Sequence, residues 1–269
     1  MVAPLAKSAE PAGPAAEATA SETALRLLRR DIVSGALKPG NKLKLRILKE
    51  RYGIGGSPMR EALAQLTAQG LVHQLSQKGF RVPPLSAAHL MDITHSRQLV
   101  EIEAVKLAIE HADAAWEDDI VASFHLLERM FHRLRGATAR PDVHELESRH
   151  QRFHRALLAA CPLRSVREFC DQLYVQATRY RLLLRRFALT REVVVAEHRI
   201  LMRAVLSRNK VAAAKALKAH ILNTADMLQG ELARQSAGAP ARRKTAGASS
   251  RSPDRVTRQG QRRQRRRTR

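Results

Sequence analysis

The sequence has little of what several common classes of protein depend on. Only two cysteines occur in 269 residues, Cys161 and Cys170, so a reduced intracellular state is favoured over a disulfide framework. No run approaches the roughly 20 apolar residues of a membrane-spanning helix, and the first residues have no apolar core of a secretory signal. We therefore expect a cytoplasmic protein with no membrane partner.

The motifs of common enzyme classes are missing too. The sequence has no nucleophile motif, no glycine-rich phosphate loop and no pair of carboxylates spaced for acid–base work. A di-iron bundle would need several inward glutamates, and no such set is apparent. One enzyme hypothesis stays open, a hydrolase or oxidase built on a His-x-x-x-His pair with Glu197 beside His198. We nevertheless expect a protein that is not an enzyme.

Acidic residues are scarce relative to basic ones. The chain holds 25 Asp and Glu against 48 Lys and Arg, a formal net charge of +23, which indicates a polyanionic partner. Residues 234–269 contribute +12 and residues 1–24 contribute −2, so +13 remains on the middle of the chain. The basic character therefore does not depend on the arginine-rich tail alone.

Composition divides the chain into four parts. Residues 1–20 are rich in Ala, Pro and Glu, and residues 234–269 are rich in Arg and poor in apolar side chains. Neither end can bury a core, so both are expected to be disordered. The tail fits either a nonspecific DNA-binding arm or a solubilising extension. We expect a DNA-binding domain over residues 21–84 and a helical domain over residues 86–233.

Turn-forming glycines separate the expected elements of the first domain. Gly35 closes a helix whose apolar stripe includes Leu28 and Ile32, and Gly53 ends a second helix. A β-rich pair around Gly79 predicts a hairpin. The expected elements are helices over 23–34, over 43–52 and from Ser57 onward, and strands within 71–76 and 80–83. Three helices and a hairpin in this order make a winged helix-turn-helix.

The third helix carries the strongest indication of nucleic-acid binding. Ser57 is expected as its N-cap and Pro58 as its first residue. Arg60 then lies in the first turn, where a cation opposes the helix dipole unless an anion neutralises it. Because helix N-termini bind phosphate readily, we expect this helix start to face a nucleic-acid backbone. A merely solvated Arg60 is the alternative for so short a motif.

The segments IVSGALKPGNKL and ERYGIGGSPMREALAQLTAQGLVHQLSQKGFRV resemble the DNA-binding domain of GntR-type bacterial transcription regulators. The form Gly-x-x-Pro-x-Arg-Glu-Ala-Leu is similar to the carbon-starvation-induced regulator branch of that family. Most relatives carry a DNA-contacting arginine one position before Ser57, where this sequence has Gly56. The resemblance implies a double-stranded DNA operator as partner. It implies the following DNA-binding residues: Arg46, Ser57, Arg60, Gln65 and Lys78.

The second domain is predicted to be entirely helical, because no β-rich alternation appears in it. About 150 residues are enough for a substantial core, which favours an antiparallel bundle of six to seven helices. The expected helices span 86–112, 116–135, 142–160, 163–188, 191–207 and 210–232. The fold class is therefore mostly α, a winged helix-turn-helix followed by a helical bundle.

Motifs in the second domain resemble the C-terminal domain of FadR-type regulators, the FCD domain. They are SRQLVEIEAVKLA from Ser96, HQRFHRAL from His150, the pair Glu197-His198, and His220. The usual ligands in that family are one Asp and three His. The resemblance thus implies a metal site of His150, His154, His198 and His220, with histidine in the Asp position. Neutral imidazoles favour Zn²⁺ or Ni²⁺ over harder ions. The same histidines also fit ordinary core positions or direct binding of an organic anion.

Two arginines are the candidate effector-binding residues. Arg97, on the first bundle helix, can hold a carboxylate through two parallel hydrogen bonds, although a surface ion pair with Glu101 is the alternative. Arg179 shares a helix face with Arg186, so one of the two can reach an interior cavity. The neighbouring cations, Arg181 among them, are expected on a solvated face.

The resemblance implies a one-component regulator, expected to be a repressor, with activation as the other possible sign. A homodimer would place two recognition helices in major grooves of a near-palindromic operator. A small organic acid bound in the helical domain, with or without a metal, would change operator affinity. The alternatives are an architectural DNA-binding protein that works through its arginine tail and the metalloenzyme considered above.

Overall fold

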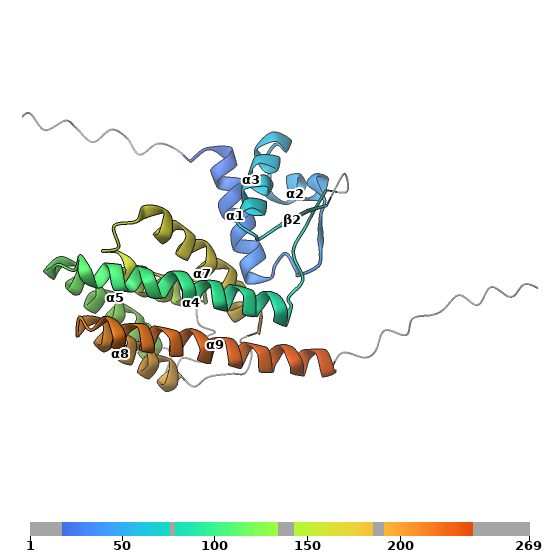
Figure 1. Ribbon diagram of the computed structural model, residues 1–269. Coiled ribbons are helices and arrows are strands. Elements are labelled where there is room, and N and C mark those ends of the chain that lie inside the picture. Colours follow the sequence, from blue (N-terminus) through green and yellow to red (C-terminus); the bar gives the residue numbers. More distant parts are fainter. Residues whose placement is uncertain (1–17, 76–78, 134–142, 185–190, 239–269) are drawn as a thin grey trace, which may run out of the picture.

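The computed structural model describes residues 18–75, 79–133, 143–184 and 191–238, which form two domains (Figure 1). The N-terminal domain contains α1 (Ala20–Ser34), β1 (Lys42–Leu43), α2 (Leu45–Tyr52), α3 (Gly56–Ala68), β2 (His73–Leu75) and β3 (Gly79–Arg81). The C-terminal domain contains α4 (Ala87–Glu110), α5 (Ala114–Arg133), α6 (Val143–Leu158), α7 (Arg164–Leu184), α8 (Arg191–Leu206) and α9 (Lys210–Gly238).

One apolar core holds the N-terminal domain together. α1 begins after Thr19, which forms a capping box with Glu22, and ends at Gly35 in the left-handed conformation. Its apolar stripe, with Leu28 fully buried, packs against α3. The three strands form an antiparallel sheet in the order β1-β3-β2, so the β2–β3 hairpin is the wing. These elements confirm the predicted winged helix-turn-helix.

The start of α3 differs from the prediction. Gly55, in an extended conformation, precedes the helix at the N-cap position, and α3 begins at Gly56. Ser57 is therefore not the N-cap, and both Ser57 and Pro58 lie within the first turn. Proline is tolerated there because the first N–H groups of a helix have no intrahelical acceptor.

Other element bounds also shift. Leu43, expected to open the second helix, lies in β1 opposite Phe80 of β3. This pairing joins segments far apart in the sequence, so local periodicity could not predict it. The first helix begins at Ala20, inside the part expected to be disordered. The last helix extends past the expected end at Leu232 to Gly238, so it includes the first residues assigned to the tail.

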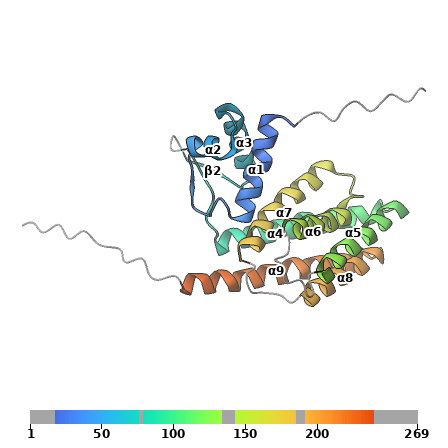
Figure 2. The same ribbon diagram turned by 180° about the vertical axis from the view of Figure 1, so that it is seen from behind.

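The C-terminal domain is a bundle of six helices within the described residues. α4 and α9 lie side by side (Figures 1 and 2). α5 packs against α6 and α8, and α8 packs against α9. Buried side chains from these helices, including Phe124, Phe153 and Leu201, form its largest core. This arrangement confirms the predicted helical bundle. No helix in the described ranges has the length and apolar character needed to span a membrane.

Helix α7 lies between the two domains (Figure 2) and packs against both α4 and α1. The Gln176 side-chain nitrogen donates a hydrogen bond of 3.0 Å to the Gln69 carbonyl in the DNA-binding domain. Leu183 fills the space beside Gly35, where an added Cβ would lie only 2.3 Å from its Cδ2 atom. The helical bundle and the DNA-binding domain are therefore connected through α7 as well as through the covalent linker.

Candidate DNA-binding surface and metal centre

The exposed face of α3 carries three of the residues predicted to contact DNA. Met59 and Leu63 on the opposite face are fully buried, which fixes the rotation of the helix about its axis. Ser57, Arg60 and Gln65 are all exposed. Because α3 begins at Gly56, Arg60 lies at the start of the second turn rather than in the predicted first turn. A helix buried on one side only, with a cation near its start, presents a surface suited to a major groove.

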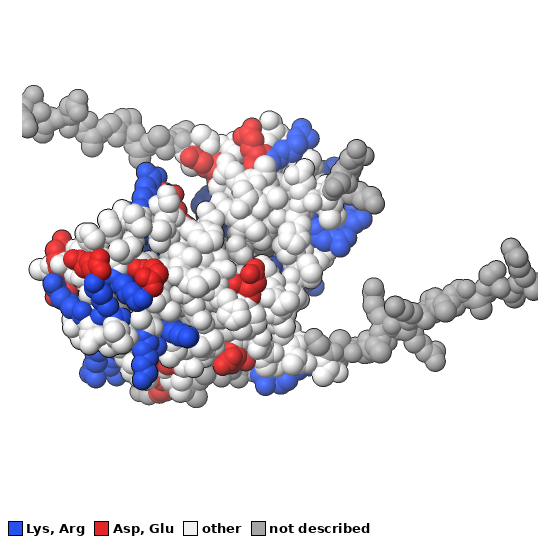
Figure 3. All heavy atoms as spheres, in the orientation of Figure 1, with Lys and Arg blue, Asp and Glu red and all other residues white. Residues whose placement is uncertain are grey.

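The remaining predicted DNA contacts lie nearby or outside the described residues. Arg46 is exposed on α2, where its guanidinium forms an ion pair of 2.7 Å with Glu50. Lys78, which was predicted to contact DNA from the wing, lies outside the described residues. Lys and Arg side chains gather along the outer edge of the DNA-binding domain in Figure 3. This edge is therefore the positively charged side of the DNA-binding domain, the side suited to a polyanionic partner.

Gly56 lies between two cations at the start of α3. A Cβ built at Gly56 would lie 3.7 Å from Arg60 Nη2 and 3.8 Å from Lys49 Cδ, with no other obstruction. Sequence analysis did not identify the exposed Lys49 as a candidate DNA-binding residue. The one available indication was its position in the last turn of α2, next to the turn that leads into α3. Gly56, which replaces the arginine found in most relatives, is thus flanked by the positive side chains of Arg60 and Lys49.

Four histidines from three helices meet inside the helical domain. His150 and His154 come from successive turns of α6, His198 from α8 and His220 from α9. One ligand atom of each lies within 4.8 Å of those of the others. His150 Nε2 is 2.7 Å from His198 Nε2 and 3.2 Å from His154 Nε2. The structure therefore brings together all four histidines of the predicted metal site.

Hydrogen bonds on the outer ring nitrogens orient two of these imidazoles. The Tyr174 hydroxyl donates to Glu147 Oε1 at 2.8 Å, so it accepts from His150 Nδ1 at 2.6 Å. His198 Nδ1 donates to the Val194 carbonyl at 2.6 Å. In a neutral imidazole one nitrogen donates and the other accepts. The network thus assigns a lone pair to Nε2 of both rings, and both lone pairs point into the cluster.

These facing lone pairs fit a cation. Two Nε2 acceptors at 2.7 Å repel each other unless a proton or a positive ion lies between them. Around a tetrahedral zinc with bonds of about 2.1 Å, ligand atoms are about 3.4 Å apart, so only a small adjustment is needed. His220 Nδ1 lies 3.5 Å from Glu197 Oε2 and has no closer acceptor. The donor set therefore fits a borderline divalent metal.

Burial keeps the central imidazoles neutral. It lowers the pKa of His154 well below its usual value, and the neighbouring charges of His150, His220 and His198 lower it further. Burial likewise lowers the pKa of His198 to about 3. Since a metal binds the neutral imidazole and competes with its proton, these side chains are in the form that a metal requires.

Glu147 connects this centre to α7. Its Oε1 accepts hydrogen bonds from Tyr174, from Thr178 at 3.0 Å, and from the guanidinium of Arg181. The Arg181 side chain is only 11% exposed, contrary to the solvated face expected for it. Sequence reasoning missed Glu147, although its position three residues before His150 places both on one helix face.

The two arginines predicted to bind an effector already have partners. Arg97 is buried and donates to both oxygens of Glu101, at 2.6 and 3.1 Å, so this ion pair lies in the interior rather than on the surface. Arg179 is also buried but donates to the carbonyl of Pro83 in the interdomain linker. Two residues along a helix rotate by about 200°. Arg181 consequently faces the histidines and Arg179 does not.

Two cavities border the histidine cluster. The smaller, of about 60 Å³, is lined by His150, His198, His220 and Arg181 among others. The larger, of about 230 Å³, lies beyond His154 between α6 and α7. Neither Arg97 nor Arg179 is among the residues that line them.

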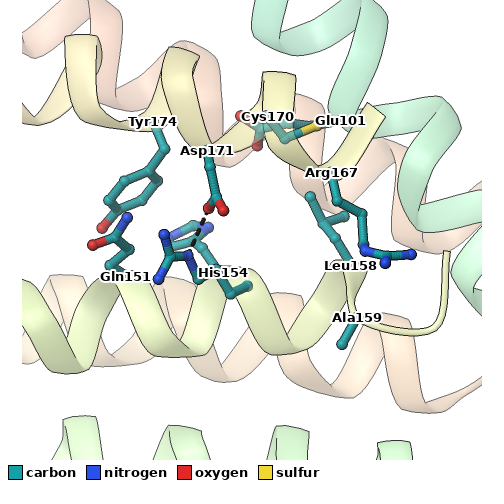
Figure 4. Close-up of a pocket in the computed structure, with 10 residues that line it drawn as sticks. Glu101, Gln151, His154, Leu158, Ala159, Arg167, Cys170, Asp171 and Tyr174 are labelled. Carbon is teal, nitrogen blue, oxygen red and sulfur yellow. Dashed lines mark hydrogen bonds and ion pairs between the residues drawn. The ribbon is translucent and has the colours of Figure 1, made fainter. Parts of the chain in front are cut away.

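Figure 4 shows the larger cavity, with Gln151 and His154 on α6 and Asp171 and Tyr174 on α7. The dashed line marks the ion pair of Asp171 with Arg155, 2.6 Å long. Glu101, the partner of Arg97, forms part of the wall. The cavity therefore combines an aromatic ring and an amide with a charged side chain of each sign.

Two further side chains of this cavity differ in reactivity and charge. Arg167 donates to the Cys161 carbonyl, and no ion pair is found for it within the described ranges. Burial raises the pKa of the Cys170 thiol to about 12, so it stays protonated. Arg167 thus contributes an uncompensated positive charge, whereas Cys170 contributes an unreactive apolar surface.

Comparison with known proteins supports the two-domain interpretation. The family described as "Bacterial regulatory proteins, gntR family" matches residues 20–82, and the family described as "FCD domain" matches residues 92–223. The chain is 36% identical over 213 residues to the HTH-type transcriptional repressor GlaR of Escherichia coli (strain K12), a match that covers 77% of this chain and 95% of GlaR. It is 35% identical over 203 residues to the uncharacterized HTH-type transcriptional regulator BphR of Paraburkholderia xenovorans (strain LB400), which covers 74% and 81% of the two chains.

Solved structures share the fold. E. coli McbR/YncC aligns with a TM-score of 0.66 at 22% identity, over 80% of this chain and 99% of that one. A putative transcriptional regulator GntR from Rhodococcus sp. RHA1 aligns with a TM-score of 0.63 at 17% identity, over 78% and 97% of the two chains. The chain belongs to the GntR family of bacterial regulatory proteins, carries an FCD domain, and is a DNA-binding transcription regulator rather than an enzyme.

Proposed function

We propose that the chain is a repressor that binds its operator as a homodimer and that a small carboxylic acid in the helical domain controls its operator affinity. The observation that carries the proposal is the path from the histidine centre through α7 to the DNA-binding domain. The relative GlaR, by its name a transcriptional repressor, supports the sign of regulation. As DNA is the partner, the proposed location is the cytoplasm.

On the DNA side, the start of α3 would contact the phosphate backbone. Arg60 and Lys49 supply positive charge beside Gly56, whose lack of a side chain allows the backbone to approach a phosphate closely. Ser57 adds a hydroxyl in the first turn, and Gln65 lies two turns further along, where an amide can bond a base edge. In this arrangement base reading depends on fewer side chains than in relatives with the additional arginine.

In the helical domain, His150, His154, His198 and His220 would hold a Zn²⁺ or Ni²⁺ ion. When bound, the ion supplies a positive charge that attracts and orients a carboxylate. The convergent Nε2 lone pairs and the neutral state of the buried rings support this assignment.

The effector would occupy the 230 Å³ cavity beside His154. That volume lies below the usual range for drug-sized ligands, which favours a small acid. One carboxylate would compete with Glu101 for the guanidinium of Arg97, and the unpaired Arg167 would attract a second. A small dicarboxylate matches these two cations, Arg167 in the wall of the cavity and Arg97 bonded to the wall residue Glu101.

Coupling to DNA would pass through α7. Tyr174 and Arg181 on one side of this helix contact the histidine centre, while Gln176 and Arg179 on the other bond the DNA-binding domain and the linker. An acid that binds more tightly to one placement of α7 would shift the population of domain arrangements. Operator affinity would change by the same coupling free energy.

The uncharged face over α4 and α9 supports a homodimer. The centre of this face carries few charged side chains in Figure 3, and Leu99 on α4 is 75% exposed. Pairing two copies there would cover Leu99 on a face with few charged side chains and present two recognition helices to a palindromic operator.

The DNA half of the proposal is tested by replacing Arg60 with Ala. We expect operator affinity to fall by about ten- to a hundredfold, because a charge-assisted hydrogen bond to phosphate or base is worth about 1.5–3 kcal/mol. DNase footprinting and a binding titration would measure the change. Arg203→Ala, the loss of an exposed arginine on α8, is the matched control and should leave affinity intact. Unchanged binding by the Arg60 variant would contradict the assignment of α3.

The metal and effector half is tested by His154→Ala. This variant should lose bound metal in elemental analysis and the response of operator affinity to small dicarboxylic acids, yet retain DNA binding without effector. His125→Ala, at an exposed position on α5, is the control. Metal-free wild-type protein that still responds to the acids would count against a metal-assisted site and favour direct binding of the anion by the histidines.

A further inference from the structure

A hollow separates α1 of the DNA-binding domain from α6 and α7 of the helical domain. Its volume is about 320 Å³, roughly that of ten water molecules in the liquid. Apolar side chains come from both domains, Leu25 and Val33 on one side and Val175 and Leu182 on the other. The hollow is bounded by both domains, has no histidine in its lining, and shares only Glu147 and Gln151 with the walls of the two histidine-lined cavities.

Positive charge without a carboxylate partner lines the α1 side. Arg26 and Arg29, one turn apart on α1, face this hollow, and neither forms an ion pair within the described residues. Arg29 Nη2 donates to Gln69 Oε1 at 2.7 Å, but its Nε is buried with no acceptor. A buried guanidinium N–H without an acceptor is costly, so the described residues leave part of the hydrogen-bonding capacity of Arg29 unused.

The acidic groups of the hollow do not supply that acceptor. Glu22 is bonded to Thr19 at the helix cap, at 2.8 and 3.1 Å. Glu147 accepts from Tyr174, Thr178 and Arg181. Burial lowers the pKa of Arg29, and the nearby charge of Arg155 adds to this effect. An anion in the hollow would relieve the repulsion between these cations and would give the guanidinium of Arg29 the charged partner that it lacks.

We infer that this hollow is a second ligand site, separate from the histidine centre, for a carboxylic acid of about ten non-hydrogen atoms in all, most of them apolar. The carboxylate bonds Arg29, with Arg26 as a second cation. The apolar body packs against Val33 and Leu182, which line the hollow from α1 and α7. A molecule of this class resembles an aromatic or medium-chain fatty acid rather than a small dicarboxylate.

Such a ligand would contact both domains at once. α1 belongs to the DNA-binding domain, while α6 and α7 carry His150 and its partner Tyr174. Glu147 borders both this hollow and the smaller histidine-lined cavity. A ligand that bridges the domains stabilises the arrangement in which they are docked, so it would bias operator binding separately from the effector of the histidine centre.

Isothermal titration calorimetry of the full chain with octanoate and benzoate tests the inference directly, with 1-octanol and benzyl alcohol as neutral controls. Both acids should bind to the wild-type chain more tightly than the matched alcohols. Arg29→Gln should weaken acid binding at least tenfold, as expected for the loss of a charge-assisted hydrogen bond. Arg203→Gln, on α8, should leave it unchanged.

Two further variants distinguish binding in this hollow from binding elsewhere on the chain. Ser148→Trp replaces an exposed residue at the rim of the hollow and should abolish acid binding while the thermal melting curve stays close to that of the wild type. His154→Ala should bind both acids as the wild type does. The inference is overturned if neither acid binds, if the alcohols bind as well as the acids, if Arg29→Gln or Ser148→Trp binds normally, or if His154→Ala loses the acids. None of these readouts depends on operator binding.

Discussion

At the scale of single residues, position 150 sets the character of the histidine centre. Histidine stands there in place of the aspartate that the FCD resemblance implies, so the proposed metal site consists of four imidazoles and no carboxylate. A bound divalent ion would keep its full charge and interact strongly with an incoming carboxylate. The hydrogen bond from His150 Nδ1 to Tyr174, at 2.6 Å, shows that the imidazole has its own support in α7.

A second residue-scale feature is the buried ion pair of Arg97 with Glu101. Its geometry is bidentate and both side chains are almost fully buried, with exposures of 4% and 5%. Glu101 therefore already accepts the hydrogen bonds from the Arg97 guanidinium that a ligand carboxylate would need. Under the proposed function, the effector would have to outcompete this internal carboxylate, and the ion pair would then help to set its affinity.

Replacing Glu101 with Gln should raise the affinity for the acid effector about tenfold, because it removes the competing charge and leaves Arg97 with a weaker neutral partner. Titration of the variant with small dicarboxylic acids, followed by calorimetry, measures the gain. The double variant Arg97→Gln/Glu101→Gln serves as the control and should lose it. Equal gains in the single and double variants would show that the acid does not bind Arg97.

At the scale of elements, a buried carboxylate ties α1 to α2. Asp31 of α1 accepts hydrogen bonds from Arg51 at 2.6 Å and Tyr52 at 2.7 Å, both on α2, and from Arg30 at 3.0 Å. Burial acts to raise the pKa of Asp31, but these hydrogen bonds and the charges of Arg30 and Arg51 outweigh it, so the pKa is lowered. Since α2 positions Lys49 against α3, this contact also supports the DNA-binding surface.

The lowered pKa predicts how stability depends on pH. A carboxyl group whose pKa is lower in the folded chain stabilises it fully above the unfolded value of about 3.9, and this contribution is lost as the pH falls through the folded pKa. Asp31→Asn should cost about 1–3 kcal/mol at pH 7 and flatten the decline of stability below pH 4. Urea denaturation between pH 3 and 7 measures both. Glu50→Gln, which removes an exposed ion pair, should cost less than about 1 kcal/mol; an equal loss would refute the special role of Asp31.

Helix α7 is the element that most connects the site to the rest of the fold. Successive positions turn it toward different neighbours, so Tyr174 and Arg181 contact the histidine centre while Arg179 contacts the linker. The sequence marked α7 as a basic helix but did not indicate which arginine faced inward. A helical wheel only separates apolar from polar faces, and both faces of α7 are buried here in part.

At the scale of the whole molecule, charge is divided between the folded domains and the C-terminal tail. Residues 239–269 hold 11 Arg and Lys244 against one Asp, whereas the described DNA-binding domain carries its own cations along one edge. Residues 239–269 therefore carry about half of the net charge, +11 of +23, and the rest of the chain carries the other half.

A chain that ends at Gly238 should keep a sharp operator footprint but lose nonspecific DNA affinity. The slope of log K against log salt should become shallower, because each cation removed from the phosphate backbone reduces the number of released counterions. Filter binding to operator and to random duplex at several salt concentrations measures both. A truncated chain that no longer protects an operator would favour the architectural role of the tail.

The sequence by itself determined the two-domain plan, the helices and the identities of the four histidines. Caps, glycines and apolar periodicity act over a few residues, so they predict where α1 and α9 begin to within a turn, and the motif spacing identified His150 and His154 on one helix face. These features depend on residues close together in the sequence, so one sequence is enough to predict them.

Only the tertiary structure decided how those pieces meet. In the folded chain, Leu43 lies in a strand opposite Phe80, and Arg97 forms an ion pair with Glu101. Arg179 bonds the linker, and the hollow beside Arg29 lies between the two domains. Each of these outcomes depends on how helices and strands pack together in three dimensions. The free energy of such contacts depends on residues that are distant in the sequence, so a local sequence pattern cannot predict it.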